Sequence, residues 1–112
     1  MVAREWKCKC PIGKKDGFIK YLLETGVKET SNARGFLGSQ VLARGAGDKV
    51  EITLVTYWEE LSSIKVFAGE QIEKAKLYPE DWKYDLEPDL MVRHYEVVES
   101  TFFTRKGHVS LL

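Results

Sequence analysis

The side chain best suited to acid–base chemistry in this sequence is that of His94. The only other histidine, His108, lies close to the C-terminus. An imidazole titrates near physiological pH, so it can take up or release a proton under cellular conditions. His94 stands inside the run VRHYE, which alternates like a strand. We expect it to be a catalytic base, and the alternative is a structural histidine that forms hydrogen bonds within or beside a subunit interface.

Aromatic and cationic residues would have to form the rest of such a site. Arg4 and Trp6 are two positions apart and therefore share one face of a strand, where Arg4 is a candidate partner for a carboxylate or an oxyanion. Tyr57 offers a hydroxyl to a ligand or across an interface. Aromatic residues on strands and helices also pack in cores, so each candidate has a structural alternative. The candidate substrate-binding residues are Arg4, Trp6, Tyr21, Tyr57, Trp58 and Phe67.

The two cysteines, Cys8 and Cys10, are also two positions apart and point to the same strand face. That geometry is poor for a disulfide between them. They could give two thiolates to a metal shared with a second chain, but neither histidine has the spacing of a further ligand. We therefore expect no metal here and interpret both as small apolar side chains on a covered strand face.

Known cofactor-binding and nucleophile motifs are missing from the sequence. It has no G-x-G-x-x-G, no P-loop, no G-x-S-x-G and no H-E-x-x-H. If the protein is an enzyme, we expect it to use no bound cofactor beyond the substrate itself.

The candidate residues are positioned by the stretch from Lys49 to Glu70, which is predicted to be a strand that leads directly into a helix. Apolar and polar residues alternate as far as Trp58, and the spacing then becomes helical. Val55 and Tyr57 make the second face of this strand largely apolar as well. A strand with two apolar faces is typical of a central strand that is covered on both sides.

The remaining elements follow from similar changes of period. Strands are expected over 2–10, 35–44, 49–58 and 90–98, with a hairpin turn at 45–48. Helices are expected from Lys14 to about Val27 and after Trp58, followed by a short helical piece over 70–78 and an ordered acidic loop over 79–89. The order β-α-β-β-α-β predicts an α+β, ferredoxin-like fold in which a four-stranded antiparallel sheet carries both helices on one face.

One domain accounts for most of the chain. The length of 112 residues is typical of a single domain, which we place at 1–98. The tail over 99–112 is expected to be a short extra strand or an arm that crosses onto a partner subunit. Because the helices cover only one sheet face, we expect the other, with Val55 and Tyr57, to pack against a second copy in a homodimer.

Charge and hydropathy exclude several classes of partner. Seventeen basic and 17 acidic residues cancel, so no net field attracts nucleic acid or an anionic membrane. The sequence has no apolar run long enough to span a membrane, and its first residues lack the apolar core of a signal peptide. We therefore expect a cytoplasmic protein.

Several short runs resemble the antibiotic biosynthesis monooxygenase family of dimeric α/β-barrel proteins. They are WEELSSIKVFAGE, then Ala75, YPED and finally RHYEV, and the resemblance extends over 2–98. It points to a subgroup of uncharacterised members and implies ferredoxin-like subunits that pair into a barrel-like dimer. It also implies a cofactor-independent monooxygenase acting on a small aromatic or quinone-like substrate, with His94 as the base and Trp6, Tyr57 and Phe67 as walls.

Two other functions are considered against this resemblance. Haem-degrading members of the family carry an Asn on the first strand and a Trp and a His at two later positions, which fall at Phe67 and Leu77 here. The first strand has Trp6 instead, and the first asparagine is Asn32, so we do not expect haem binding. The alternative function is that of a non-catalytic dimeric protein that binds a small ligand or has a structural role.

Overall fold

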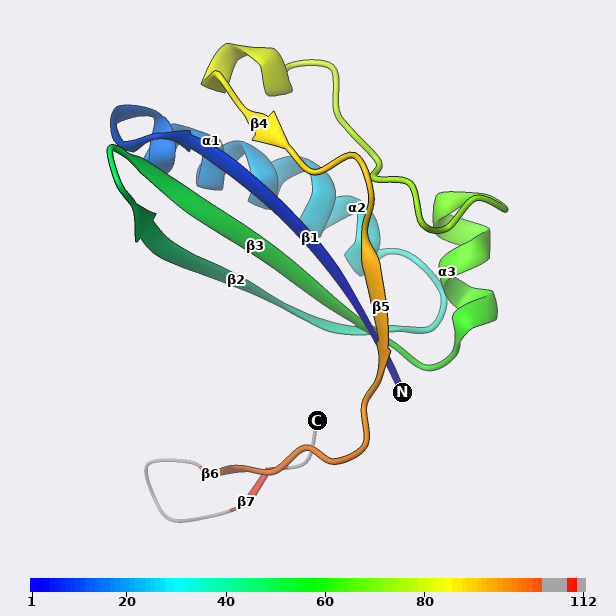
Figure 1. Cartoon of the computed structure of the whole chain (residues 1–112). Helices are drawn as coiled ribbons and strands as arrows, with labels where there is room; N and C mark the ends of the chain where they lie inside the picture. Colours follow the sequence, from blue (N-terminus) through cyan, green and yellow to red (C-terminus); the bar gives the residue numbers. More distant parts are fainter. Residues whose placement is uncertain (104–108, 111–112) are drawn as a thin grey trace.

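The computed structural model describes residues 1–103 and 109–110. An open antiparallel sheet of five strands forms its centre, in the order β2-β3-β1-β4, with β5 also paired to β1 (Figure 1). The strands are β1 (Val2–Pro11), β2 (Phe36–Ala46), β3 (Lys49–Trp58), β4 (Glu87–Pro88) and β5 (Arg93–Glu96). The α+β class and the antiparallel sheet are as predicted, and the arrangement is compatible with a ferredoxin-like fold.

Two helical regions accompany the sheet. The first begins after the short turn η1 (Ile12–Lys14) and continues through α1 (Lys15–Leu22), the π-helical segment η2 (Leu23–Val27) and α2 (Lys28–Ser31). The second is α3 (Leu61–Ala68), and a 3-10 turn, η3 (Asp81–Tyr84), follows later. No helix among the described residues is long and apolar enough to cross a membrane.

Both helical regions pack on the same face of the sheet, which we call the inward face. Along β1 and β3 this face carries the alternating positions that include Cys8, Ile52 and Trp58. Phe18 of α1 packs against the first two of these residues, and Ile64 of α3 packs against Trp58. The inward face therefore buries the apolar surface of both helical regions.

The core consists of two separate apolar clusters on this face. The Cys8 cluster is formed by the buried residues Cys8, Cys10, Phe18, Leu22, Val50 and Ile52. The Trp58 cluster is formed by Trp58, Ile64 and Ile72. The prediction that the cysteines are small buried side chains is confirmed, since both thiols are free and buried.

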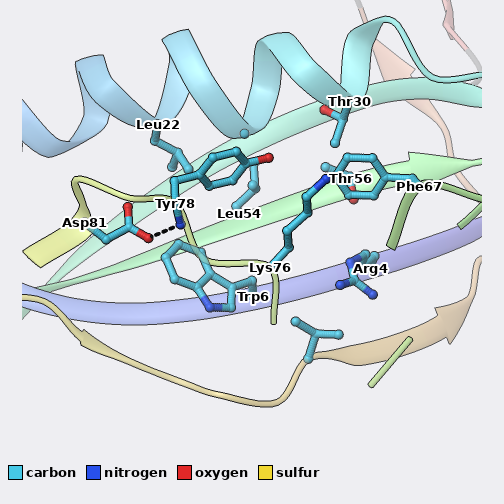
Figure 2. Close-up of a pocket in the computed structure, with 12 residues that line it drawn as sticks. Arg4, Trp6, Leu22, Thr30, Leu54, Thr56, Phe67, Lys76, Tyr78 and Asp81 are labelled. Carbon is cyan, nitrogen blue, oxygen red and sulfur yellow. Dashed lines mark hydrogen bonds between the residues drawn. The ribbon is translucent and has the colours of Figure 1, made fainter. Parts of the chain in front are cut away.

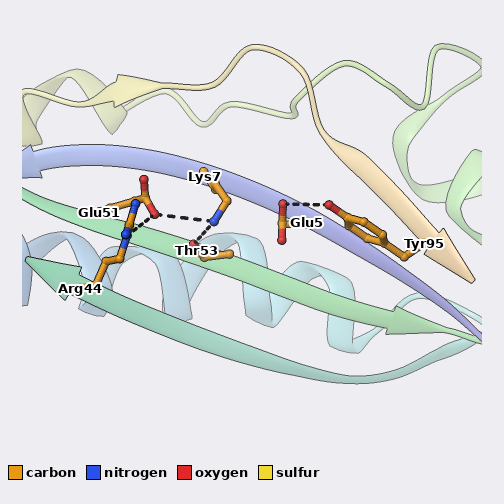
Figure 3. Close-up of polar contacts among 6 residues, drawn as sticks. All are labelled: Glu5, Lys7, Arg44, Glu51, Thr53 and Tyr95. Carbon is orange, nitrogen blue, oxygen red and sulfur yellow. Dashed lines mark hydrogen bonds and ion pairs between the residues drawn. The ribbon is translucent and has the colours of Figure 1, made fainter. Parts of the chain in front are cut away.

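The opposite, open face of the sheet is more polar than the sequence pattern indicated (Figure 3). Glu51 forms ion pairs with Lys7, at 3.6 Å, and with Arg44, at 3.0 Å. The Tyr57 hydroxyl, predicted to meet a ligand or a partner, donates to the Gln40 side chain at 2.7 Å. The Tyr95 hydroxyl lies 3.4 Å from a Glu5 carboxylate oxygen on the same face.

The segment after α3 differs most from the prediction. Residues 70–78 are not helical, and their only strand-like contact in the described part of the chain is a bridge from Lys74 to Met91. The backbone here bonds to distant partners instead, with Ala75 N–H donating to Leu90 at 2.9 Å and Val92 N–H donating to Glu73 at 2.7 Å. These bonds replace the helical ones, because each peptide group has one N–H to give.

The same bonds explain two smaller differences. The last sheet strand was expected over 90–98 but is only Arg93–Glu96, since the backbone before it pairs with the segment after α3. The acidic loop expected over 79–89 contains η3 and β4, and β4 adds a fifth strand beside Cys8 and Lys9. In the tail, β6 (Phe102–Phe103) pairs with β7 (Val109–Ser110), and 104–108 and 111–112 lie outside the described residues.

Candidate functional site

A cavity of about 50 Å³ lies on the inward face, in the gap between the two apolar clusters (Figure 2). The sheet forms its floor, the helical run forms one wall, and the segment between α3 and β5 forms the other. We call residues 70–86 of this last segment the strap. The lining residues are Arg4, Trp6, Leu22, Gly26, Thr30, Leu54, Thr56, Phe67, Lys76, Tyr78, Asp81 and Val92.

Arg4 is the most unusual residue of the cavity, because it is a charged side chain that is only 6% exposed. Its Nη1 donates to the carbonyl oxygen of Ile72 at 2.5 Å, and its Nη2 donates to that of Lys74 at 3.1 Å. None of the ion pairs among the described residues includes Arg4. Burial lowers the pKa of this guanidinium, and the negative charge of Glu73 opposes that shift.

His94 is a neighbour of Arg4 across β1 and β5. The Nη1 of Arg4 lies 2.9 Å from Nε2 of the imidazole. A guanidinium has no lone pair to accept a hydrogen bond, so Arg4 donates and Nε2 accepts, which places the proton of the neutral ring on Nδ1. Burial lowers the pKa of His94, the charge of Arg4 lowers it further, and Glu73 raises it. The ring is therefore held neutral near pH 7, beside the cavity lining and outside it.

The strap contributes three functional groups to the cavity. Lys76 crosses it, with its ammonium paired to Glu29 and 4.3 Å above the centre of the Phe67 ring. Asp81 accepts a hydrogen bond from the backbone N–H of Tyr78 at 2.8 Å, and burial raises the pKa of its carboxyl group.

Tyr78 supplies the third group. Its hydroxyl oxygen is buried and has no hydrogen-bond partner of good geometry among the described residues. Burial raises the pKa of this phenol, and the nearby carboxylate of Glu29 adds to the rise. The hydroxyl therefore stays protonated and can donate to a molecule inside the cavity.

The helical wall comes close to the cavity at Gly26, inside the π-helical segment. A side chain there would meet Leu22 at 3.4 Å and the Tyr78 ring at 3.7 Å, so only glycine leaves this volume open. Single π-helical turns inside α-helices often occur at functional sites. Thr30, one turn later, turns its hydroxyl back to the Val27 carbonyl at 2.9 Å.

The structure brings together only some of the residues expected to form a site. Arg4, Trp6 and Phe67 line the cavity, and the Trp6 ring nitrogen donates to the Asp89 carbonyl at 3.0 Å. Tyr21 lies outside the lining, where its ring stacks on Tyr84 at 5.5 Å and its hydroxyl accepts from the Glu80 backbone.

The other two candidates are further removed. Tyr57 lies on the open face of the sheet, and Trp58 is fully buried in its own cluster with its ring nitrogen donating to Thr56 at 2.8 Å. The sequence analysis did not assign the strap residues Lys76, Tyr78 and Asp81 to the site. The run YPED, which begins at Tyr78 and ends at Asp81, was the signal that could have indicated two of them.

Metal ligation has little support in the described residues. No group of three or more His, Cys, Asp or Glu side chains there could hold an ion. Burial raises the pKa of the Cys8 thiol to about 12, and burial also raises that of Cys10. Because a thiol binds metal as its thiolate, two protonated and buried thiols are poor ligands.

No protein-family model matches this chain. No curated protein sequence matches it either. Its function is therefore inferred from its own residues.

Proposed function

We propose that this chain is a cofactor-independent monooxygenase whose site is the cavity, and that its substrate is a small aromatic or quinone-like molecule. The observation that carries the proposal is a buried guanidinium that forms no ion pair among the described residues, although the charge of Glu73 acts on it, set beside the aromatic side chains of Trp6, Phe67 and Tyr78. Aromatic walls suit a flat ring, and a cation in a site of low dielectric stabilises a phenolate.

The chemistry needs only a substrate that can lose a proton and then react with dioxygen. For a hydroquinone, one oxygen atom enters the ring to give a hydroxyquinone and the other leaves as water, so the substrate supplies all the electrons. Arg4 would stabilise the phenolate, and the Tyr78 hydroxyl would donate to a substrate oxygen. His94 lies outside the lining, so as the base it would have to release the Arg4 N–H and turn Nε2 toward the cavity before it accepts the substrate proton.

Oxygen uptake tests this function. The purified protein is mixed with hydroquinones, phenols and anthrones, and dioxygen consumption is followed with His94→Ala and Arg4→Gln beside the wild type. We expect uptake with at least one of these classes and a loss of at least about tenfold in each variant, since general bases contribute about 10²–10⁴-fold. Absence of uptake by the folded wild type over the whole panel would contradict the oxygenase proposal.

We also propose that the chain is a ferredoxin-like subunit of a dimeric α/β barrel. The strand order supports this proposal, as does the open face, where Leu42 and Tyr95 are exposed beside Val55. A second copy packed on this face would cover these side chains. Sedimentation should then give a dimer for the wild type and a monomer for Val55→Lys, whereas a monomeric wild type would rule out this assembly.

A second function, binding without catalysis, is favoured by one observation. The lone pair of the proposed base is already occupied, because Nε2 of His94 accepts from Arg4. In a binding protein His94 would only position Arg4. His94→Ala should then leave the affinity for an aromatic ligand within about threefold of wild type, while no variant or substrate gives oxygen uptake.

A further inference from the structure

This inference rests on the proposed function, in which the cavity is the substrate site. It concerns which aromatic ligands the charges around the cavity would favour. We propose that the cavity takes a single-ring aromatic carboxylate, with the carboxylate at the Arg4 end. The inference concerns the charge and size of the ligand and does not depend on the reaction. In such a ligand the carboxylate would take the place at Arg4 that we assign to the phenolate of a hydroquinone.

Arg4 has unused capacity for an anion. Of its five N–H groups, the described residues engage two on Nη1, through Ile72 and His94, and one on Nη2, through Lys74. The remaining N–H groups are the one on Nε and one on Nη2, the two nitrogens that commonly hold both oxygens of one carboxylate. A buried charge that is not in an ion pair is costly, so a carboxylate that pairs directly with Arg4 gains more than a neutral group, although Glu73 offsets part of the charge.

The other charged groups orient the ligand. Lys76 is already paired with Glu29, and the neutral ring of His94 adds no charge. Glu73 places one negative charge near Arg4, which weakens the attraction at this end. Asp81 lies at the opposite end of the cavity from Arg4 (Figure 2). A carboxylate would be repelled there and attracted at the Arg4 end, with its ring between them against Trp6 and Phe67.

The cavity as it stands is smaller than one aromatic ring requires, so we infer a one-ring ligand and not a larger one. An apolar cavity of about 150 Å³ is enough for benzene, and this one measures about 50 Å³. Movement of Lys76 and Tyr78 can provide the missing volume, because the side chains of these two strap residues cross the cavity. The Lys76–Glu29 contact that holds this side chain in place is solvent-exposed, so it can open without exposing the core.

The test is calorimetric titration of the full chain with benzoate, benzamide and acetate. Benzamide has the same shape without the charge, and acetate has the charge without the ring. We expect benzoate to bind at least about tenfold more tightly than benzamide, and acetate to show no measurable binding. Equal affinities for benzoate and benzamide, or for benzoate and acetate, would overturn the inference.

Variants locate the binding site. Arg4→Gln should remove the preference for benzoate over benzamide, while Lys83→Gln, a charge loss at a strap residue outside the cavity lining, should keep it. Because Arg4 is buried and its variant could unfold, a second variant is Gly26→Val, which fills the cavity from the helical wall. It should weaken both aromatic ligands at least about tenfold, and Gly13→Val, whose side chain would meet open space, should not.

The outcomes separate this inference from the proposed function. Benzoate binding that is unchanged in folded Gly26→Val would place the ligand elsewhere and overturn the inference. Oxygen uptake with neutral hydroquinones, together with equal affinities for benzoate and benzamide, would support the oxygenase proposal and overturn the charge preference. A preference for benzoate that Arg4→Gln or Gly26→Val abolishes, without any oxygen uptake, would support the inference and contradict the oxygenase.

Discussion

The inward face of β1 has two different environments along its length. At one end Cys8 and Cys10 are 2% and 0% exposed and pack against Phe18. A few residues earlier in the same strand, Arg4 is equally covered but is held by hydrogen bonds to the strap and to His94. The first environment is close-packed, and the second borders a cavity.

The difference follows from residue type, because both ends belong to the same strands and the same face. Small and branched apolar side chains interdigitate with the helix above them and leave no space. A guanidinium must be met by acceptors at fixed positions, and here the strap supplies them as backbone carbonyls. These hydrogen bonds tie the strap to Arg4 on β1, and the cavity lies there, between the two apolar clusters. The cavity thus lies beside Arg4 and its hydrogen-bond partners and not beside the close-packed apolar residues.

The largest expected change in stability comes from a substitution in the close-packed Cys8 cluster. Phe18→Ala removes a ring that is 0% exposed and leaves a void. We expect the free energy of unfolding to fall by about 3–5 kcal/mol, measured by urea denaturation. Leu23→Ala, on the same helical run but 48% exposed, should cost less than about 1 kcal/mol. Similar losses for the two variants would mean that the Cys8 cluster is not close-packed.

In the cavity we expect a smaller change in the free energy of unfolding, and an increase instead of a decrease. Tyr78→Phe deletes a buried hydroxyl without a partner among the described residues. Since such a group costs free energy, we expect the free energy of unfolding to stay constant or rise by about 1 kcal/mol. A fall of more than about 1 kcal/mol would show that the hydroxyl is bonded in solution, with Glu29 as the nearest candidate.

Gly26→Ala should also stabilise the protein, by up to about 1 kcal/mol, because alanine is the better helix former and its methyl group has space beside Leu22. The same methyl group narrows the cavity next to Tyr78. Thermal denaturation and benzoate titration of one sample measure both effects. Higher stability together with unweakened benzoate binding would contradict the position that we assign to the ligand.

The smallest effect concerns the pH dependence of stability. Folding lowers the pKa of His94, so the unfolded chain binds a proton more readily. The stabilisation contributed by the neutral ring is complete above pH 6.5 and is lost as the pH falls below it. We expect the melting temperature to fall between pH 7.5 and pH 5.5.

The control for this effect is a variant that keeps the hydrogen bond of His94. His94→Gln should flatten the pH dependence, because glutamine can still accept from Arg4 but does not titrate. An unchanged slope in His94→Gln would contradict the neutral state that we assign to His94.

The sequence predicted the two environments unequally. Alternation along Cys8, Cys10 and Ile52 was sufficient to place them on a buried face, because period and burial are local properties of a strand. The strap was predicted to be helical over 70–78, because apolar spacing there suits a helix. Its conformation depends on bonds to Arg4 and to Leu90, which are far away in the sequence, and no local pattern contains them.

The candidate site was accordingly predicted in part. Arg4, Trp6 and Phe67 were identified from residue type and shared faces, and they do line the cavity. Tyr57 was a candidate too, but strand register places it on the open face. Tyr78 was missed because only the folded strap carries its hydroxyl into the interior.

The central claim is that ligand binds on the inward face, between the two apolar clusters. Amide chemical shifts of the isotope-labelled protein, recorded during titration with benzoate, test it most directly. The claim predicts the largest shifts at Gly26, Phe67 and Tyr78, with little change at Glu51 and Thr53 on the open face. Shifts confined to the open face would contradict it.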